Sequence, residues 1–160
     1  MSSVVGAIFS ENREKILLIQ RRDVPVWVLP GGGIEDGETP IEAIIRECKE
    51  ETGFDVIVLK KIGDYYPKNR LAKRTYFFEC SIVKGNMSTG SETRNIRFFP
   101  INELPKWLPP PYEDWIIDAY QNPSTPFSKT LTQVNYPTLI KHLFLHPILV
   151  FRFLLARMGL

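Results

Sequence analysis

Short apolar segments separated by polar or glycine-containing turns recur along most of the 160-residue chain. Segments of this length that are rich in β-branched and aromatic residues are typical of β-strands. The expected strands are Val4–Phe9, Ile16–Gln20, Trp27–Leu29, Phe54–Leu59, Tyr76–Val83 and Asn95–Phe99. A polar turn joins the first two, and Pro30 with the following glycines ends the third. The pattern therefore predicts a strand-rich domain.

Residues Thr39–Thr52 follow a helical pattern instead. Thr39 can act as the N-cap, Pro40 suits the first helical position, and Glu42 can complete a capping box. Apolar side chains then recur at helical spacing and should form one buried stripe, made of Ile41, Ile44, Ile45 and Cys48. Gly53 stands where a left-handed residue would end the helix.

The order of the elements predicts the fold class and the domain organisation. Two short helices are expected at Ile101–Leu108 and Tyr112–Tyr120, on either side of a Pro-Pro-Pro break. Strands with one central helix and late helices indicate a mixed α+β domain over residues 1–120. Residues 121–130 are polar with two prolines and are interpreted as a linker, which leads to an apolar helical extension at residues 131–160.

Size and composition restrict the class of protein. The length suits one domain with its own core. The formal net charge of +2 gives no strong indication of a nucleic-acid partner. Cys48 and Cys80 do not form a disulfide framework or a metal motif, so a cytoplasmic location is expected. The first apolar run is only about six residues long with no basic segment before it, which favours a strand over a signal peptide.

The segment His142–Leu160 is strongly apolar and has two interpretations. Pro147 and Arg152 interrupt it, so its apolar runs are shorter than the roughly 20 residues that a membrane span needs. It can form a helix packed on the domain or on a second subunit, which would allow a homodimer. Alternatively it lies on a membrane surface, where Lys141, Arg152 and Arg157 would meet anionic headgroups.

Acidic residues are concentrated between residues 31 and 54, which hold seven carboxylates and two basic side chains. Glu47, Glu50 and Glu51 have the i, i+3, i+4 spacing that places side chains on one face of a helix. Carboxylates this close repel one another unless a cation joins them, and Mg²⁺ prefers oxygen ligands. A solvated charged face is the other interpretation of the same spacing.

The same segment, GGGIEDGETPIEAIIRECKEETGF, resembles the Nudix box of the Nudix hydrolases, written G-x5-E-x7-R-E-U-x-E-E-x-G-U with U apolar. The matching residues are Gly32, Glu38, Arg46, Glu47, Glu50, Glu51, Gly53 and Phe54. Cys48 is the one departure, because an aliphatic residue is usual there; a buried cysteine behaves as a small hydrophobe. The strand pattern extends the resemblance over about residues 1–120.

The resemblance implies an α/β/α sandwich around a mixed β-sheet, and a metal-dependent hydrolase that cuts a pyrophosphate bond. Glu47, Glu50 and Glu51 would hold Mg²⁺ or Mn²⁺, with the backbone carbonyl of Gly32 as a further ligand. Arg46 would orient the glutamates, while Glu38 and Gly53 would support the geometry of the loop and the helix. A catalytically silent nucleotide-binding module and a membrane- or partner-tethered enzyme are the alternatives.

The general base and the phosphate ligands are less closely defined. Glu50 or Glu51 would take the proton from the attacking water, and Glu92 is a third candidate because many members of the family carry a glutamate near that place. Basic residues near the box are candidates to contact substrate phosphates, and these are Arg21, Arg22, Lys68, Arg70, Lys73 and Arg74. The candidate substrates are ADP-ribose or a nucleotide sugar, a dinucleoside polyphosphate, and a nucleoside triphosphate.

Overall fold

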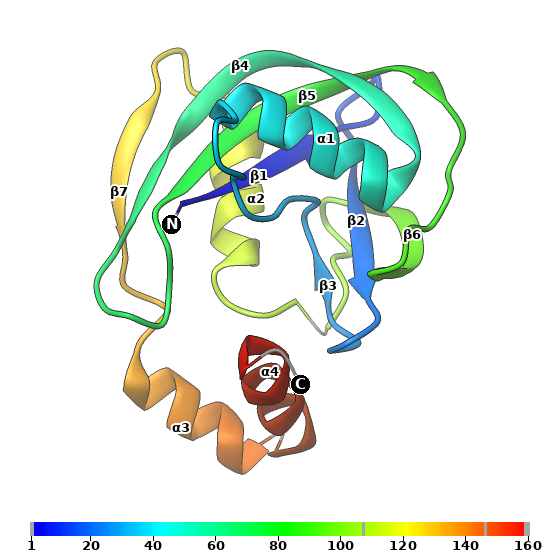
Figure 1. Ribbon diagram of the computed structural model, residues 1–160. Helices are drawn as coiled ribbons and strands as arrows, with labels where there is room; N and C mark the ends of the chain where they lie inside the picture. Colours follow the sequence, from blue (N-terminus) through cyan, green and yellow to red (C-terminus); the bar gives the residue numbers. More distant parts are fainter. Residues whose placement is uncertain (1, 107, 146, 159–160) are drawn as a thin grey trace.

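The computed structural model describes residues 2–106, 108–145 and 147–158 (Figure 1). The strands are β1 (Ser3–Ile8), β2 (Lys15–Arg21), β3 (Trp27–Val28), β4 (Phe54–Pro67), β5 (Thr75–Gly85), β6 (Thr93–Pro100) and β7 (Phe127–Leu131). The helices are α1 (Pro40–Thr52), α2 (Tyr112–Tyr120), α3 (Tyr136–Leu145) and α4 (Pro147–Met158). The predicted strand-rich α+β organisation is confirmed.

The strands form two sheets. One has the order β1-β5-β4-β7, in which β1 pairs with β5 and β4 with β7 in parallel, while β4 and β5 are antiparallel. The other is antiparallel, with the order β3-β2-β6. The first sheet is therefore mixed in direction, as expected.

Alternating side chains of the strands contact different helices. In β1, Val4 and Ile8 belong to the core cluster that contains α1 residues such as Ile44. Val5 and Ala7 belong to the other cluster, which contains α2 residues including Trp115, Ile116 and Ala119. Because successive side chains of a strand point to opposite faces, the sheets lie between α1 and α2. The expected α/β/α sandwich is confirmed (Figure 1).

Helix α1 buries a different face from the predicted one. Ile44 and Cys48 are buried as expected, but Ile41 and Ile45 are 49% and 37% exposed. The buried face continues instead through Glu51 and Thr52. The helix is thus rotated so that a carboxylate, rather than two isoleucines, faces the interior.

Two other sequence predictions are corrected. Residues 101–106 and 108 are not helical, so the predicted Ile101–Leu108 helix is wrong. Pro105 disfavours helical backbone at the residue before it, and Ile101 instead donates its N–H to the carbonyl of Glu14 at 2.9 Å. Strand β4 continues eight residues beyond the predicted end at Leu59, pairing with β5 through several bulges.

The segment interpreted as a linker, residues 121–130, contains most of strand β7. Phe127–Leu131 pairs in parallel with Gly63–Pro67 at the edge of the sheet. A Cβ at Gly63 would lie 2.6 Å from the Phe127 ring, so the close approach depends on that glycine. Residues 128–130 are exposed, which explains the polar sequence of an edge strand.

Cys48 and Cys80 are free and buried, and they belong to one core cluster. The cytoplasmic location inferred from them stays a prediction. None of the helices in the described ranges is long and apolar enough to cross a membrane.

Candidate active site

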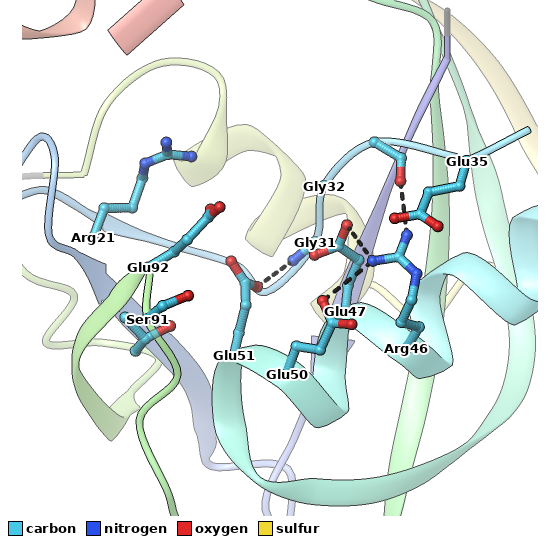
Figure 2. Close-up of a pocket in the computed structure, with 12 residues that line it drawn as sticks. Arg21, Gly31, Gly32, Glu35, Arg46, Glu47, Glu50, Glu51, Ser91 and Glu92 are labelled. Carbon is cyan, nitrogen blue, oxygen red and sulfur yellow. Dashed lines mark hydrogen bonds and ion pairs between the residues drawn. The ribbon is translucent and has the colours of Figure 1, made fainter. Parts of the chain in front are cut away.

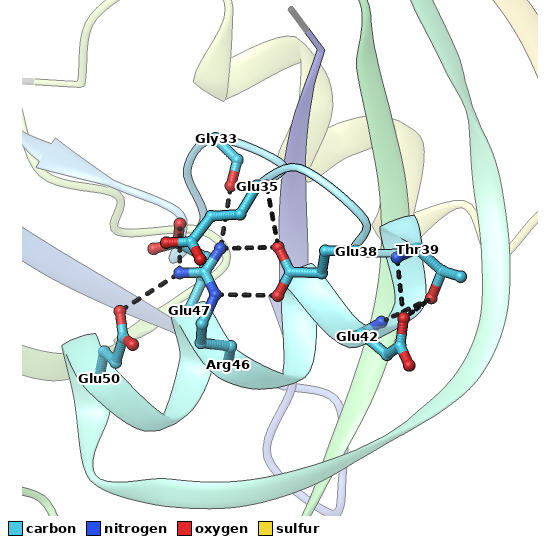
Figure 3. Close-up of polar contacts among 8 residues, drawn as sticks. All are labelled: Gly33, Glu35, Glu38, Thr39, Glu42, Arg46, Glu47 and Glu50. Carbon is cyan, nitrogen blue, oxygen red and sulfur yellow. Dashed lines mark hydrogen bonds and ion pairs between the residues drawn. The ribbon is translucent and has the colours of Figure 1, made fainter.

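The acidic helix α1 begins and ends as its sequence predicts. Oγ1 of Thr39 accepts a hydrogen bond from the Glu42 N–H, and the Glu42 side chain accepts one from the Thr39 N–H at 2.8 Å, which completes the capping box (Figure 3). Gly53 ends the helix with a φ of 78°, and its N–H donates to the carbonyl of Lys49. Both ends therefore fix the position of the glutamates between them.

The glycine loop lies directly against two of these glutamates. The N–H of Gly31 donates to Oε2 of Glu51 at 2.8 Å. A Cβ at Gly31 would lie 2.2 Å from the carbonyl oxygen of Val4, and one at Gly32 would lie 2.3 Å from Oε1 of Glu47. The loop thus needs glycine because backbone and carboxylates occupy the space of a side chain.

Arg46 joins the loop to the acidic helix (Figure 3). Its Nε and Nη2 donate to the two carboxylate oxygens of Glu38 at 2.9 and 3.0 Å, and Nη2 also donates to the carbonyl of Gly33 at 3.0 Å. Its Nη1 donates to Glu47 at 3.0 Å and to Glu50 at 3.3 Å. The bidentate pair lowers the pKa of Glu38 and raises that of Arg46. Both groups are therefore charged in the folded protein.

The three glutamates of the helical acidic face differ in environment. The Glu50 side chain is 60% exposed, whereas Glu51 is only 8% exposed. Burial, helped by the charges of Glu47 and Glu92, raises the pKa of Glu51 to about 8 against the opposing effect of the Gly31 N–H. Burial also raises the pKa of Glu47. Negative charge at these two positions is thus unfavourable unless a cation compensates for it.

These carboxylates line a pocket of about 390 Å³ between the loop, α1 and the start of β6 (Figure 2). The lining residues are Arg21, Gly31, Gly32, Gly33, Glu35, Arg46, Glu47, Glu50, Glu51, Ser91, Glu92 and Thr93. Glu92 faces Glu51 across the pocket in Figure 2, and the Arg21 guanidinium lies above Glu92 in that view. The structure therefore brings the box and residue Glu92 together, although about 40 residues separate them along the chain.

Gly90, which no sequence pattern indicates as a site residue, helps to place Glu92. A Cβ at Gly90 would lie 2.2 Å from the carbonyl oxygen of Glu50, so the loop before β6 packs directly on the end of α1. The carbonyl of Glu92 in turn accepts the N–H of Arg22 at 2.9 Å. Close packing of two loops was not visible in the sequence, because a single glycine in a turn-rich segment has many explanations.

The donor set of the pocket suits a hard divalent cation, because it consists of carboxylates and backbone carbonyls. Glu51 is buried and Glu47 partly buried, and the raised pKa values of both show that their negative charge is disfavoured, which is the electrostatic reason for a cation. The side chains are nevertheless spread out: within the described residues, no three His, Cys, Asp or Glu side chains converge closely enough to hold an ion. Arg46, which binds Glu47 and Glu50, holds those carboxylates toward itself.

Of the basic residues proposed to contact phosphates, one lines the pocket and the others do not. Arg21 lines the pocket and forms a bidentate pair with Asp23, which raises the pKa of Arg21. Arg22, Arg70 and Arg74 do not line it, and neither do Lys68 and Lys73. The Arg74 guanidinium stacks over the rings of Tyr66 and Tyr76, 4.9 and 4.6 Å from their centroids.

Comparison with known proteins gives the family. The NUDIX domain model matches residues 2–121, and the chain belongs to the NUDIX family. It is 38% identical over 98 residues to a Bacillus subtilis protein named "Putative 8-oxo-dGTP diphosphatase", covering 61% of this chain and 65% of that protein. It is 37% identical over 110 residues to an ADP-ribose pyrophosphatase of Methanocaldococcus jannaschii, covering 65% and 64%. The match thus spans less than two thirds of either relative.

A solved structure supports the same fold. The crystal structure of an ADP-ribose pyrophosphatase from Streptococcus suis superimposes with a TM-score of 0.64 at 26% identity. The match covers 80% of this chain and 96% of that one.

Proposed function

We propose that the protein is a metal-dependent hydrolase that cuts a pyrophosphate bond in a nucleoside diphosphate linked to another group. One observation carries the proposal: the buried Glu51 and the partly buried Glu47 line one pocket, with raised pKa values, beside a glycine loop that approaches both carboxylates. A structural role alone would not require two carboxylates in an environment that penalises their charge.

The residues proposed to hold Mg²⁺ or Mn²⁺ are Glu47, Glu50 and Glu51, with the carbonyl of Gly32. That carbonyl accepts the N–H of Val4 at 2.9 Å, which leaves its second lone pair for an ion. The bound ion would neutralise charge on the phosphates and make a water molecule more acidic.

The remaining roles follow from the contacts. The bidentate pair of Arg46 and Glu38 fixes the position of the acidic helix relative to the glycine loop. Arg21 lies in the pocket lining, which supports it as a ligand of a substrate phosphate. The proton of the attacking water would pass to Glu50, Glu51 or Glu92. Glu92 has in its favour that it comes from a different loop and faces the other carboxylates (Figure 2).

The relatives favour two substrate classes, ADP-ribose and oxidised purine nucleoside triphosphates such as 8-oxo-dGTP. Nucleotide sugars and dinucleoside polyphosphates contain the same kind of bond and remain in the proposal. The products distinguish them, because cleavage of ADP-ribose gives AMP and ribose 5-phosphate, whereas cleavage of a triphosphate next to the α-phosphate gives a monophosphate and pyrophosphate.

The test is a substrate panel on the purified full chain, with Mg²⁺ or Mn²⁺ and with a chelator, followed by chromatographic identification of the products. Metal-dependent release of a nucleoside monophosphate from one class would support the proposal and name the substrate. Tight binding of a nucleotide without turnover in either metal would contradict it and favour the catalytically silent module.

A further inference from the structure

Helices α3 (Tyr136–Leu145) and α4 (Pro147–Met158) form a pair at one end of the molecule, below β3 in Figure 1. Nη2 of Arg152 in α4 donates to the carbonyl of Arg22, the residue after β2, at 3.1 Å. Nδ2 of Asn69 donates to the carbonyl of Val134, just before α3, at 2.9 Å. The helix pair is therefore attached to the domain near the strand that carries the pocket residue Arg21.

The helix pair exposes an unusual amount of apolar surface. Of the fifteen large apolar side chains found exposed in the described part of the chain, six belong to it: Tyr136, Ile140, Phe144, Leu145, Ile148 and Phe151. Phe144 is 82% exposed and Phe151 is 61% exposed. In α3, three of the six recur every fourth residue, which places them on one face of the helix. Such a concentration is typical of a binding surface.

The charge of the same region has one sign. From residue 119 to residue 160 the sequence contains no aspartate and no glutamate. Lys141 and Arg152 are exposed on the helix pair, next to the apolar side chains. The charged side chains of the helix pair itself are all basic, although Glu113 and Asp114 of α2 line a pocket with Lys141. An apolar surface with these basic side chains complements a surface that is apolar inside and anionic outside.

We propose that α3 and α4 bind the surface of a membrane containing anionic lipids, with the apolar side chains in the acyl boundary and Lys141 and Arg152 at the headgroups. The lengths of the helices fit this arrangement. The 12 residues of α4 correspond to about 18 Å, whereas a span needs about 30 Å. A second copy of the chain fits less well, because a symmetric contact through this face would bring equal positive charges together.

The first experiment is co-sedimentation of the full chain with vesicles of phosphatidylcholine, with and without phosphatidylglycerol, at low and high salt. Binding should require the anionic lipid and should weaken at high salt, because ionic screening acts on the headgroup contacts. Absence of binding to phosphatidylglycerol vesicles at low salt would overturn the proposal. The measurement needs no substrate, so it is independent of whether the proposed hydrolase activity is found.

Variants locate the surface. Replacing Phe144 and Phe151 together by Ser should weaken vesicle binding by roughly tenfold or more, since two buried aromatic rings are lost. The matched control replaces Leu59 and Val83 by Ser, which are 55% and 58% exposed on β4 and β5. The control variant should bind as the wild type does. Circular dichroism and thermal melting verify that both variants are folded, and equal binding of the two variants would overturn the proposal.

Charge and self-association give two more outcomes. Lys141→Gln should weaken binding to anionic vesicles about fivefold, as expected for one basic residue near the surface, whereas Lys84→Gln, at an exposed position at the end of β5, should not.

Sedimentation velocity without vesicles should show no dimer that depends on Phe144 and Phe151. A dimer abolished by Phe144→Ser with Phe151→Ser, combined with no vesicle binding by the wild type, would overturn the proposal in favour of a second copy.

Discussion

Gly32 and Glu47 fit together only because residue 32 has no side chain: a Cβ there would lie 2.3 Å from Oε1 of Glu47 and 2.6 Å from its Cδ. The atoms that would clash belong to the end of a flexible side chain, so the carboxylate can move aside. A side chain at residue 32 would therefore displace the Glu47 carboxylate rather than destabilise the fold.

Gly32→Ala should lower kcat/KM by roughly 10- to 100-fold, because small displacements of groups that position substrate or metal have effects of that size. The melting temperature should stay close to that of the wild type, since the displaced atoms are those of a carboxylate beside a pocket. Steady-state kinetics and thermal melting of the same preparation measure both quantities.

Gly33→Ala is the matched control for this prediction. A Cβ at Gly33 meets nothing within 4 Å, and its carbonyl would still accept the hydrogen bond of Arg46. This variant should keep nearly full activity. Equal losses for the two variants would show that the loop, rather than the contact of Gly32 with Glu47, limits the reaction.

The guanidinium of Arg46 cannot be replaced by an ammonium group. Lysine cannot reproduce the fork that binds both oxygens of Glu38 while also reaching Gly33 and Glu47. Arg46→Lys should therefore weaken the activation by Mg²⁺ about 10- to 100-fold, the usual effect of losing a residue that orients metal ligands. Metal titrations of the hydrolysis rate measure it. Arg94→Lys, at an exposed position of β6, is the control, and similar titrations for the two variants would contradict the prediction.

Local rules were sufficient for the central helix and most strands. The capping box of Thr39 and Glu42 and the terminal Gly53 depend on residues close together in sequence, and α1 begins and ends where they indicate. The motif likewise identified five residues that the structure brings together: Glu38, Arg46, Glu47, Glu50 and Glu51. Arg46 binds Glu38, and the four residues other than Glu38 line the pocket together.

Features that depend on tertiary packing were predicted poorly. Apolar spacing predicted Ile41 and Ile45 in the core, but the helix turns Glu51 inward to meet the Gly31 N–H. Strand β7 is polar because it lies at a sheet edge, so its sequence resembles a linker. Arg21 lines the pocket and the other basic candidates do not. This difference depends on where the loops pack, which the spacing of residues along the chain does not show.

Tyr112 gives a pH-dependent prediction. Burial raises its pKa to about 12, and the nearby Arg21 opposes the shift. Since an unfolded tyrosine ionises near pH 10, the unfolded chain loses its proton first, and stability falls as the pH rises from about 10 toward about 12. Tyr112→Phe removes this group. Between pH about 9 and about 11, the free energy of unfolding of the variant should therefore fall by about 1 kcal/mol less than that of the wild type.

Urea denaturation at the two pH values measures that difference. Tyr120→Phe is the control, because Tyr120 is 50% exposed at the end of the same helix. Its stability should depend on pH as that of the wild type does. A Tyr112→Phe variant with the wild-type dependence would show that the phenol is solvated in solution.

Glu51 is the residue on which the proposed metal site depends most. In Glu51→Gln, the amide oxygen still accepts the Gly31 N–H, so the fold should persist. The buried group can no longer be charged, and the metal-free variant should be at least as stable as the wild type at neutral pH.

The kcat of Glu51→Gln should nevertheless fall at least about 100-fold, and Mg²⁺ should raise its melting temperature less than it raises that of the wild type. Glu103→Gln, in the exposed turn after β6, controls for loss of a carboxylate elsewhere and should leave both quantities unchanged. A Glu51→Gln variant with the wild-type rate and the wild-type response to Mg²⁺ would place the metal site somewhere other than this pocket.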